Sequence, residues 1–354
     1  MLMTLISFVV LLGVLIFIHE LGHFAVAKKV GIRVDRFSLG FPPNIFTTKR
    51  GETEYCIGMI PLGGYVKMAG ESPDEGSTGQ PYEFASKKVW QRFLVIFAGP
   101  FMNYALAIVL FGALLFAYGE PFAVEEAVIG QVGKETPAAS AGLLPDDKII
   151  EIDGVPVTTF ADLREIVMPR PGQALEVVWL REGDTLNAAI TPDPLPITDS
   201  LGVADTVGQL GVSVKMKFER TYSLGSAFTA GFTNCNAFVG QIFLFVKDLI
   251  TGDVAANAVG GPIYIAQQSG EAARQGLHSF LFLMAVLSVN LAVLNILPIP
   301  VLDGGHMVFL AIEKIKGSPL TMKARMYAQQ VGMLFLMGFI VFVSWNDIMR
   351  WLPN

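Results

Sequence analysis

The sequence predicts a polytopic α-helical membrane protein with four transmembrane helices, a membrane-associated β-loop and one inserted α+β domain. Hydrophobic residues make up 52% of the 354 residues and charged residues only 16%, whereas a soluble domain is usually about a quarter charged. Four apolar runs are predicted to cross a bilayer. A stretch rich in turn residues and scattered charges separates the second run from the third.

The charge argues against a nucleic-acid-binding protein, and the cysteine content argues against a disulfide. The net charge of −6 and the pI near 5.3 provide no basic surface, so no nucleic-acid partner is expected. Cys56 and Cys235 fall in segments that we expect on opposite sides of the membrane, so no disulfide is predicted.

The first apolar run, residues 2–18, ends at a metal-binding motif within the segment 1–36. His19 and His23 are four residues apart, so a helix places both imidazoles on one face, where they can bind one zinc ion. Glu20 is placed to act as general base on a zinc-bound water. The run lacks a basic N-terminal region and a cleavage pattern, so we expect a retained span rather than a signal peptide.

Basic residues directly after this run predict its orientation. By the positive-inside tendency, its motif end lies in the cytoplasm and the N-terminus lies outside. These residues are Lys28, Lys29, Arg33 and Arg36.

Residues 37–92 predict a β-loop region on the cytoplasmic side. Residues 61–64 carry turn signals and are flanked by β-type residues, which indicates a hairpin close to the membrane. An ordinary cytoplasmic loop is the alternative. The low charge of residues 55–65 favours a strand edge that pairs with an extended peptide.

The second span is predicted at residues 93–118. Gly99 and Pro100 interrupt it, which indicates a kink or a close helix contact. Asn103 either bonds to a neighbouring helix or contributes to the active site.

The third apolar run, residues 280–302 of a segment that reaches residue 312, ends in a broken helix. Two prolines and two glycines surround Asp303. Freed backbone groups at membrane depth are tolerated mainly where they line a protein cavity. Asp303 is therefore the best candidate for a third zinc ligand, with His306 as a competing one. Residues 313–354 are predicted to contain a basic cytoplasmic linker and the fourth span, residues 331–351.

A shared metal site restricts the topology. His19 and Asp303 must lie at the same depth in the membrane. Each follows the apolar run of its own span, so these two spans point the same way and an odd number of crossings lies between them. The span at 93–118 supplies one. Residues 224–246, within the connector 197–279, are therefore expected to lie at the outer interface as an amphipathic helix. Residues 119–279 carry twenty Asp and Glu against ten Lys and Arg, which fits an outside location.

Residues 119–196 have the composition of a small soluble module. The segments 137–143, 147–155 and 160–163 resemble a PDZ domain of the bacterial protease-associated type. Such domains bind peptides by adding a strand to a sheet edge beside a helix. The alternative is a module that only spaces or shields the membrane core.

The chain resembles the bacterial site-2 proteases in four features. These are the motif of His19, Glu20 and His23, the loop Pro-Leu-Gly-Gly-Tyr-Val-Lys, the single PDZ-like insert, and the motif of Asn295 and Asp303. The chain is most similar to the RseP (regulator of sigma-E protease) group, which acts in the envelope stress response. The resemblance implies zinc bound by His19, His23 and Asp303, with Glu20 as the base.

The resemblance also implies a substrate site and a reaction. Asn295 matches a position that helps to hold substrate, and the β-loop would pair with the unwound substrate strand. The expected β-loop positions are Gly58, Met59, Ile60, Gly63, Gly64 and Tyr65. The reaction is hydrolysis of a peptide bond in or near a transmembrane segment, with the PDZ domain as a size filter. Better-known members carry two tandem PDZ domains, whereas this chain has one.

The resemblance implies an enzyme of the bacterial inner membrane, with the N-terminus and the PDZ domain in the periplasm and the active site near the cytoplasmic side. Its expected partners are the lipid bilayer, peptide ligands of the PDZ domain, and single-span substrates such as anti-sigma factors or signal-peptide remnants. The rival hypotheses are an inert peptide-binding adaptor, which Glu20 argues against, and a metal transporter, which the lack of an internal repeat argues against.

Overall fold

The computed structural model describes residues 2–71, 78–198, 204–220, 222–254 and 258–349. The chain divides into two compact units. The first comprises Met1–Ala117 and Tyr222–Asn354, and the second comprises Tyr118–Thr221.

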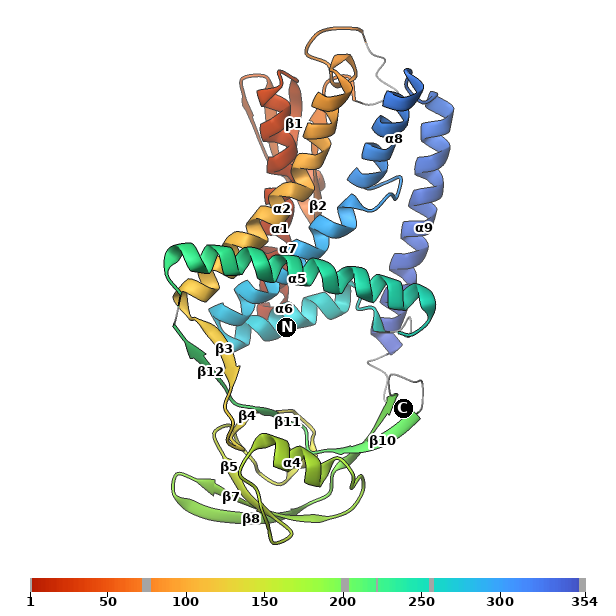
Figure 1. The fold of residues 1–354 in the computed structure, drawn as a ribbon. Helices are drawn as coiled ribbons and strands as arrows, with labels where there is room; N and C mark the ends of the chain where they lie inside the picture. Colours follow the sequence, from red (N-terminus) through yellow and green to blue (C-terminus); the bar gives the residue numbers. More distant parts are fainter. Residues whose placement is uncertain (1, 72–77, 199–203, 221, 255–257, 350–354) are drawn as a thin grey trace. The chain divides into compact units, whose positions relative to one another are not determined.

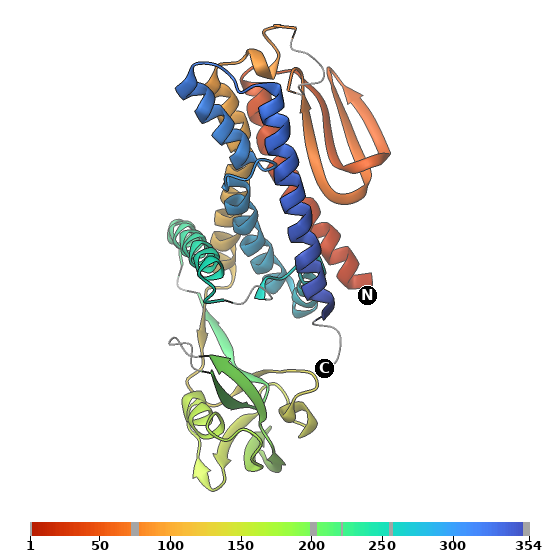
Figure 2. The ribbon, with the colours of Figure 1, turned by 90° about the vertical axis from the view of Figure 1, so that its right-hand side faces the viewer.

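Four helices of the first unit are long and apolar enough to cross a membrane. Among the described residues these are α1 (Leu2–Lys29), α2 (Val89–Ala117), α7 (Leu277–Ile296) and α9 (Met322–Met349). They run along the length of the unit (Figures 1 and 2). The predicted fold class, a polytopic membrane protein with four spans, is confirmed. The end of the predicted fourth span, from Arg350 on, lies outside the described residues.

Helix α2 is the centre of the first unit, because it packs against α1, α5, α7 and α8. Apolar side chains fill the contacts among α1, α2 and α7. Leu11 and Leu15 of α1, for example, are fully buried in a cluster with Met284 of α7. The helix continues through Pro100, so the predicted interruption is a close helix contact and not a break.

Helix α5 (Leu224–Thr251) crosses the long helices (Figures 1 and 2). It approaches α2 where two glycines meet, since a Cβ on Gly231 would lie 2.6 Å from the main-chain nitrogen of Gly112. Helix α5 is not among the four candidate spans. Helix α6 (Pro262–Gln275) follows. At the N-terminal end of α6, the N–H groups of Gly261 and Tyr264 donate hydrogen bonds to Asp347 of α9.

The predicted third span is shorter than expected. Helix α7 ends at Ile296, and α8 (Asp303–Lys316) begins after a six-residue break. The break follows from the two prolines, which lack the N–H that a helix needs. Short local bonds satisfy part of the backbone, such as those from Leu297 N–H to Leu294 O and from Leu302 N–H to Ile299 O.

Strands β1 (Val34–Arg50) and β2 (Thr53–Met68) form a larger structure than the predicted hairpin. Each strand folds back on itself, so residues 36–39 pair with both residues 64–67 and residues 54–57. Among the described strands, none pairs with the other edge of residues 64–66. Apolar residues such as Ala27, Phe37 and Val66 pack the sheet against α1.

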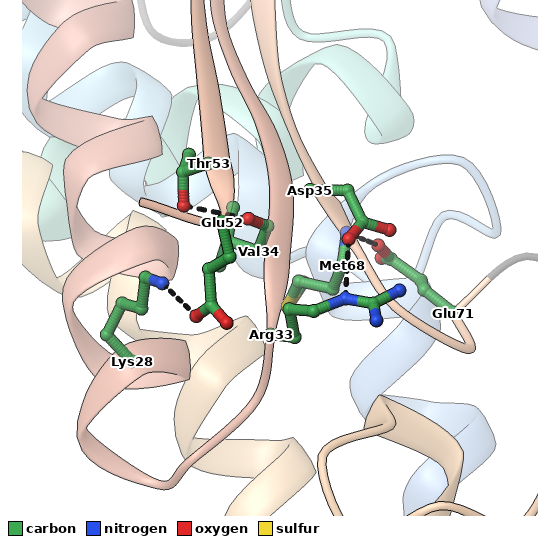
Figure 3. A network of polar contacts seen from close by, with 8 residues as sticks. All are labelled: Lys28, Arg33, Val34, Asp35, Glu52, Thr53, Met68 and Glu71. Atoms are coloured by element: carbon green, nitrogen blue, oxygen red, sulfur yellow. Dashed lines mark hydrogen bonds and ion pairs between the residues drawn. The ribbon is translucent and has the colours of Figure 1, made fainter. Parts of the chain in front are cut away.

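Polar contacts fix the base of this sheet (Figure 3). Lys28 of α1 pairs with Glu52, and the Thr53 hydroxyl donates to the carbonyl of Val34 at 2.8 Å. Arg33 donates to Asp35 at 2.8 Å. The sheet is therefore anchored to the end of α1 that follows the histidines.

The second unit is an α+β domain. Its elements are β3 (Glu120–Ala123), β4 (Ile129–Val132), α3 (Pro137–Ser140), β5 (Lys148–Ile152), β6 (Val155–Pro156), α4 (Phe160–Val167), β7 (Leu175–Arg181), β8 (Asp184–Ile190), β9 (Asp193–Thr198), β10 (Ala204–Gln209), β11 (Val212–Val214) and β12 (Met216–Glu219). One sheet has the order β6-β5-β7-β8. A core that includes Ile149, Val177 and Leu163 lies between this sheet and α4.

This unit extends beyond the boundary predicted at residue 196. Strand β10 pairs with β9, β11 with β4 and β12 with β3, so the chain returns to the start of the unit before it leaves. The sequence prediction placed these short strands in the connector, because the partners of β11 and β12 lie far away in the chain.

Candidate functional site

Three predicted metal-binding side chains converge in the first unit. The Nε2 atoms of His19 and His23 lie 3.1 Å apart. Asp303 Oδ2 lies 3.1 Å from His19 Nε2, and Oδ1 lies 3.5 Å from His23 Nε2. Among the described residues, these three form a group whose ligand atoms all lie within 4.8 Å of one another.

The break between α7 and α8 brings Asp303 to the histidines. A Cβ on Gly304 would collide with the carbonyl oxygens of Ile296 and Leu297, and one on Gly305 would collide with that of Ile299. The first turn of α8 therefore folds back onto the end of α7 only because two glycines follow Asp303.

Helix α2 supplies the surface on which both histidines rest. The Nδ1 atom of His23 lies 2.8 Å from the carbonyl oxygen of Val95, so it donates its proton there and leaves Nε2 as the ligand atom. A Cβ on Gly99 would collide with Nε2 of His23 and would lie 2.8 Å from Cε1 of His19. The Asn103 amide lies 3.4 Å from Nδ1 of His19.

These donors fit a zinc ion. Zinc in catalytic sites takes three protein ligands from His and carboxylate groups and keeps a further position open. The three residues supply two imidazole nitrogens and one carboxylate, and the bond from His23 to Val95 sets the tautomer that binding requires.

Glu20 lines the same cavity of about 280 Å³ as the three metal-binding residues. It packs beneath the β-sheet, since a Cβ on Gly64 would lie 3.0 Å from Cγ of Glu20. Its carboxylate thus lies next to both the metal-binding group and residues 64–68 of β2.

The other predicted site residues divide into two groups. Gly64, Tyr65 and His306 line the cavity. The remaining predicted positions do not line it: Gly58, Met59, Ile60 and Gly63 lie toward the far end of the sheet, and Asn295 lies in the last turn of α7.

Further residues line the cavity beyond the predicted site positions. Val66 and Met68 come from β2, and Glu71, which no sequence motif indicates, accepts a hydrogen bond from the Met68 N–H (Figure 3). Removal from water raises the pKa of the Glu71 carboxyl to about 7, against the effect of that hydrogen bond. Arg325 and Gln329 of α9 complete the wall.

A buried ion pair joins α2 to α8 at the edge of the cavity. Arg92 donates two hydrogen bonds to the Glu313 carboxylate, at 3.1 and 2.5 Å, and a third to the carbonyl of Lys87. The side chains of Arg92 and Glu313 are 8% and 10% exposed. Arg325 of α9 approaches the same carboxylate at 3.6 Å. The signal in the sequence is the one charged residue of α2 and a single acid among the basic residues that end α8, but nothing there pairs them.

The second unit has a groove of its own, with a volume of about 450 Å³. Helix α4 forms one wall with Leu163 and Val167, and residues 207–212 form the other. Among the described strands, β11 pairs only with β4. The groove thus lies between a helix and a strand edge.

Comparison with known proteins agrees with the motifs. The family model described as Peptidase family M50 matches residues 7–339. A protein of Agrobacterium fabrum that is provisionally named a zinc metalloprotease is 37% identical, over 97% of this chain and 95% of that protein. The zinc metalloprotease RasP of Oceanobacillus iheyensis is 30% identical, over 98% of this chain and 99% of that protein. The PDZ domain of the SdrC-like protein from Listeria monocytogenes is 18% identical over 26% of this chain and 90% of that chain, with a TM-score of 0.20. The full-length family match and the relatives of similar length show that this chain belongs to peptidase family M50, the site-2 protease family.

Proposed function

We propose that this protein is an intramembrane zinc endopeptidase that hydrolyses a peptide bond in or near the transmembrane segment of single-span membrane proteins. The observation that carries the proposal is the convergence of His19, His23 and Asp303 beside Glu20. Membership of a peptidase family and four candidate spans support it.

In this proposal His19, His23 and Asp303 hold the zinc ion, and Glu20 moves the proton. Bound zinc lowers the pKa of water and polarises a carbonyl group. Glu20 accepts a proton from the attacking water and passes it to the leaving amine. The position of Glu20 beneath Gly64 supports this role, because a peptide along residues 64–68 would lie next to its carboxylate.

The β-sheet is proposed to hold the substrate in an extended form. A helical substrate hides its carbonyl groups in hydrogen bonds, so it must unwind before attack. Among the described strands, none covers the outer edge of residues 64–66, so this edge can offer the freed backbone groups new partners. Gly64 and Tyr65 belong to this edge, and Asn295 is proposed to hold the substrate from the end of α7.

The far end of the sheet is proposed to contact lipid. It exposes apolar side chains that a soluble loop would rarely carry together, among them Ile45 at 71% and Met59 at 58%. In this proposal Gly58, Met59, Ile60 and Gly63 shape the membrane end of the sheet. A Cβ on Gly58 would collide with the carbonyl of Phe41, so this turn needs a glycine.

We place the enzyme in the bacterial inner membrane, with its N-terminus and the PDZ-like unit in the periplasm. The basic residues after the first span and the acidic excess of residues 119–279 support this orientation. The groove between α4 and residues 207–212 would bind peptides and restrict access of larger substrates. Anti-sigma factors and signal-peptide remnants are the proposed substrate classes, and the envelope stress response is the proposed context.

Glu20→Gln tests the proposal. The variant should keep its zinc and lose cleavage by about 10²- to 10⁴-fold, because general acid–base catalysis contributes about that much. Membranes that contain the wild type or the variant are compared for single-span proteins that accumulate uncut, and the zinc content of each purified protein is measured.

Glu52→Gln is the matched control, since Glu52 is an exposed residue that pairs with Lys28 away from the cavity. It should cut like the wild type. Full cleavage by Glu20→Gln would contradict the proposal. Wild-type protein that binds zinc and peptides but cuts no membrane protein would favour the adaptor hypothesis instead.

A further inference from the structure

The two histidines of the metal-binding group are held in different ways. His23 has a main-chain carbonyl at its Nδ1 atom, 2.8 Å away, which accepts its proton. His19 has only a side-chain amide there: within the described part of the chain, Asn103 is the hydrogen-bonding group that lies at Nδ1 of His19, at 3.4 Å. Both partners come from one face of α2, since residues 95, 99 and 103 are four apart.

Metal binding sets a chemical requirement on Nδ1 of His19. The Nε2 atom faces both Asp303 and His23, so Nε2 is the atom that points at the metal position. A neutral imidazole that binds metal through Nε2 carries its proton on Nδ1. That proton needs an acceptor, and a buried N–H without one costs about 1–3 kcal/mol.

Asn103 can supply this acceptor. Its side chain is fully buried, and its Oδ1 atom has no hydrogen-bond partner among the described residues. The two ends of an amide are nearly equal in size, so a half turn about the last side-chain bond exchanges Oδ1 and Nδ2 without moving other atoms. After that turn, Oδ1 faces Nδ1 of His19.

The main chain of Asn103 is independently fixed. The Ser288 hydroxyl of α7 donates a hydrogen bond of 2.7 Å to the Asn103 carbonyl, and Ser288 is itself fully buried. The amide therefore projects from a rigid point toward the ring of His19. Partners of this kind orient metal-binding imidazoles and make them stronger donors.

We infer that Asn103 is a positioning residue of the metal site: its Oδ1 accepts a hydrogen bond from the Nδ1–H of His19 and so holds Nε2 toward the metal. This inference rests on the proposed function. It assigns the buried Asn103 amide to the metal site and not to the contact between helices.

The test compares Asn103→Leu and Asn103→Asp as full-length proteins in detergent. Leucine has a similar volume but no acceptor, so zinc and cobalt(II) should bind about 10- to 100-fold more weakly, the usual loss when such a partner is removed. Aspartate keeps an acceptor oxygen in place, so the affinity should stay within about three-fold of wild type or exceed it. Affinities are measured by competition with a chelating dye.

A spectroscopic measurement on Asn103→Asp provides a second readout. A carboxylate makes the His19 imidazole a stronger donor, so the visible absorption band of bound cobalt(II) should shift from its wild-type position. Ser269→Ala is the control: it removes a buried hydrogen bond, from the Ser269 hydroxyl to the Ala266 carbonyl within α6, away from the metal-binding group, so it should lower thermal stability without changing metal affinity or the cobalt band.

Two results would overturn the inference. One is a folded Asn103→Leu protein with wild-type metal affinity. The other is an Asn103→Asp protein with an unshifted cobalt band, and this second result applies even if the leucine variant does not fold. A wild-type protein that binds no metal would instead overturn the proposed function, so the two failures are distinguishable.

Discussion

The α2 wall and the α9 wall around the candidate metal site are built differently. The α2 wall lines the cavity with Arg92 and Ile96, but toward the histidine rings it presents main chain, namely the carbonyl of Val95 and the bare Cα of Gly99. The α9 wall presents the long side chains of Arg325 and Gln329. In the apolar stretch of each helix, 44% of the α2 residues are buried but only 17% of the α9 residues. A main-chain wall moves only with its helix, whereas long side chains change rotamer, so the geometry of the metal site is set from the α2 side.

The largest effect is expected at the ion pair that joins α2 to α8, whose Glu313 is also approached by Arg325 of α9. Arg92→Met leaves the Glu313 carboxylate buried without its bidentate partner, and breaking such a pair costs about 3–5 kcal/mol. The free energy of unfolding in detergent micelles should fall by that amount. The double variant Arg92→Met with Glu313→Leu should recover much of the loss, because neither member of the buried pair is then left without its partner, and the remaining Arg325 is 30% exposed. Equal losses in the single and double variants would show that the ion pair does not hold α2 and α8 together.

A smaller but more local effect is expected in the α2 wall. Gly99→Ala inserts a methyl group into the contact with His23 and His19, and overpacking of this kind costs about 1–3 kcal/mol. The histidines must move apart, so zinc affinity and cleavage should both fall sharply. Gly13→Ala is the control, because its added methyl meets nothing within 4 Å and should be neutral or stabilising. Wild-type zinc affinity in Gly99→Ala would mean that the rings are not confined by α2.

The smallest effect is expected at the far end of α9. Asp347 accepts hydrogen bonds from Gly261 and Tyr264 at 2.9 and 3.0 Å, in place of a capping side chain on α6 itself. Asp347→Ala should therefore lower the free energy of unfolding by about 0.5–2 kcal/mol, as for other caps, and leave zinc affinity unchanged. A large loss of zinc affinity would show that α9 does help to set the metal geometry.

The sequence predicted the parts of the site that depend on local spacing. The helical repeat placed His19 and His23 together, and the prolines around residue 300 predicted the helix break beside Asp303. The clustering of these residues, the four candidate spans and the family followed from such local signals. Their roles in catalysis stay predictions until the variants are measured.

The sequence did not predict contacts made by main chain or by distant partners. The Val95 carbonyl has no side-chain signature, and nothing in the sequence pairs Arg92 with Glu313 across 221 positions. The fold-back of β1 and the return of β10, β11 and β12 were missed for the same reason, since strand pairing depends on partners that local periodicity does not identify.

The order of the metal-binding residues along the chain has a consequence during synthesis. His19 and His23 belong to α1, which is synthesised before α2, whereas Asp303 follows much later, after the whole second unit. A growing chain that has inserted α1 and α2 holds two of the three residues and has no carboxylate to complete the group. The proposed catalytic group is thus complete only when α8 docks on α2, so we expect a nascent chain to cut no neighbour in the membrane until its own insertion is nearly complete.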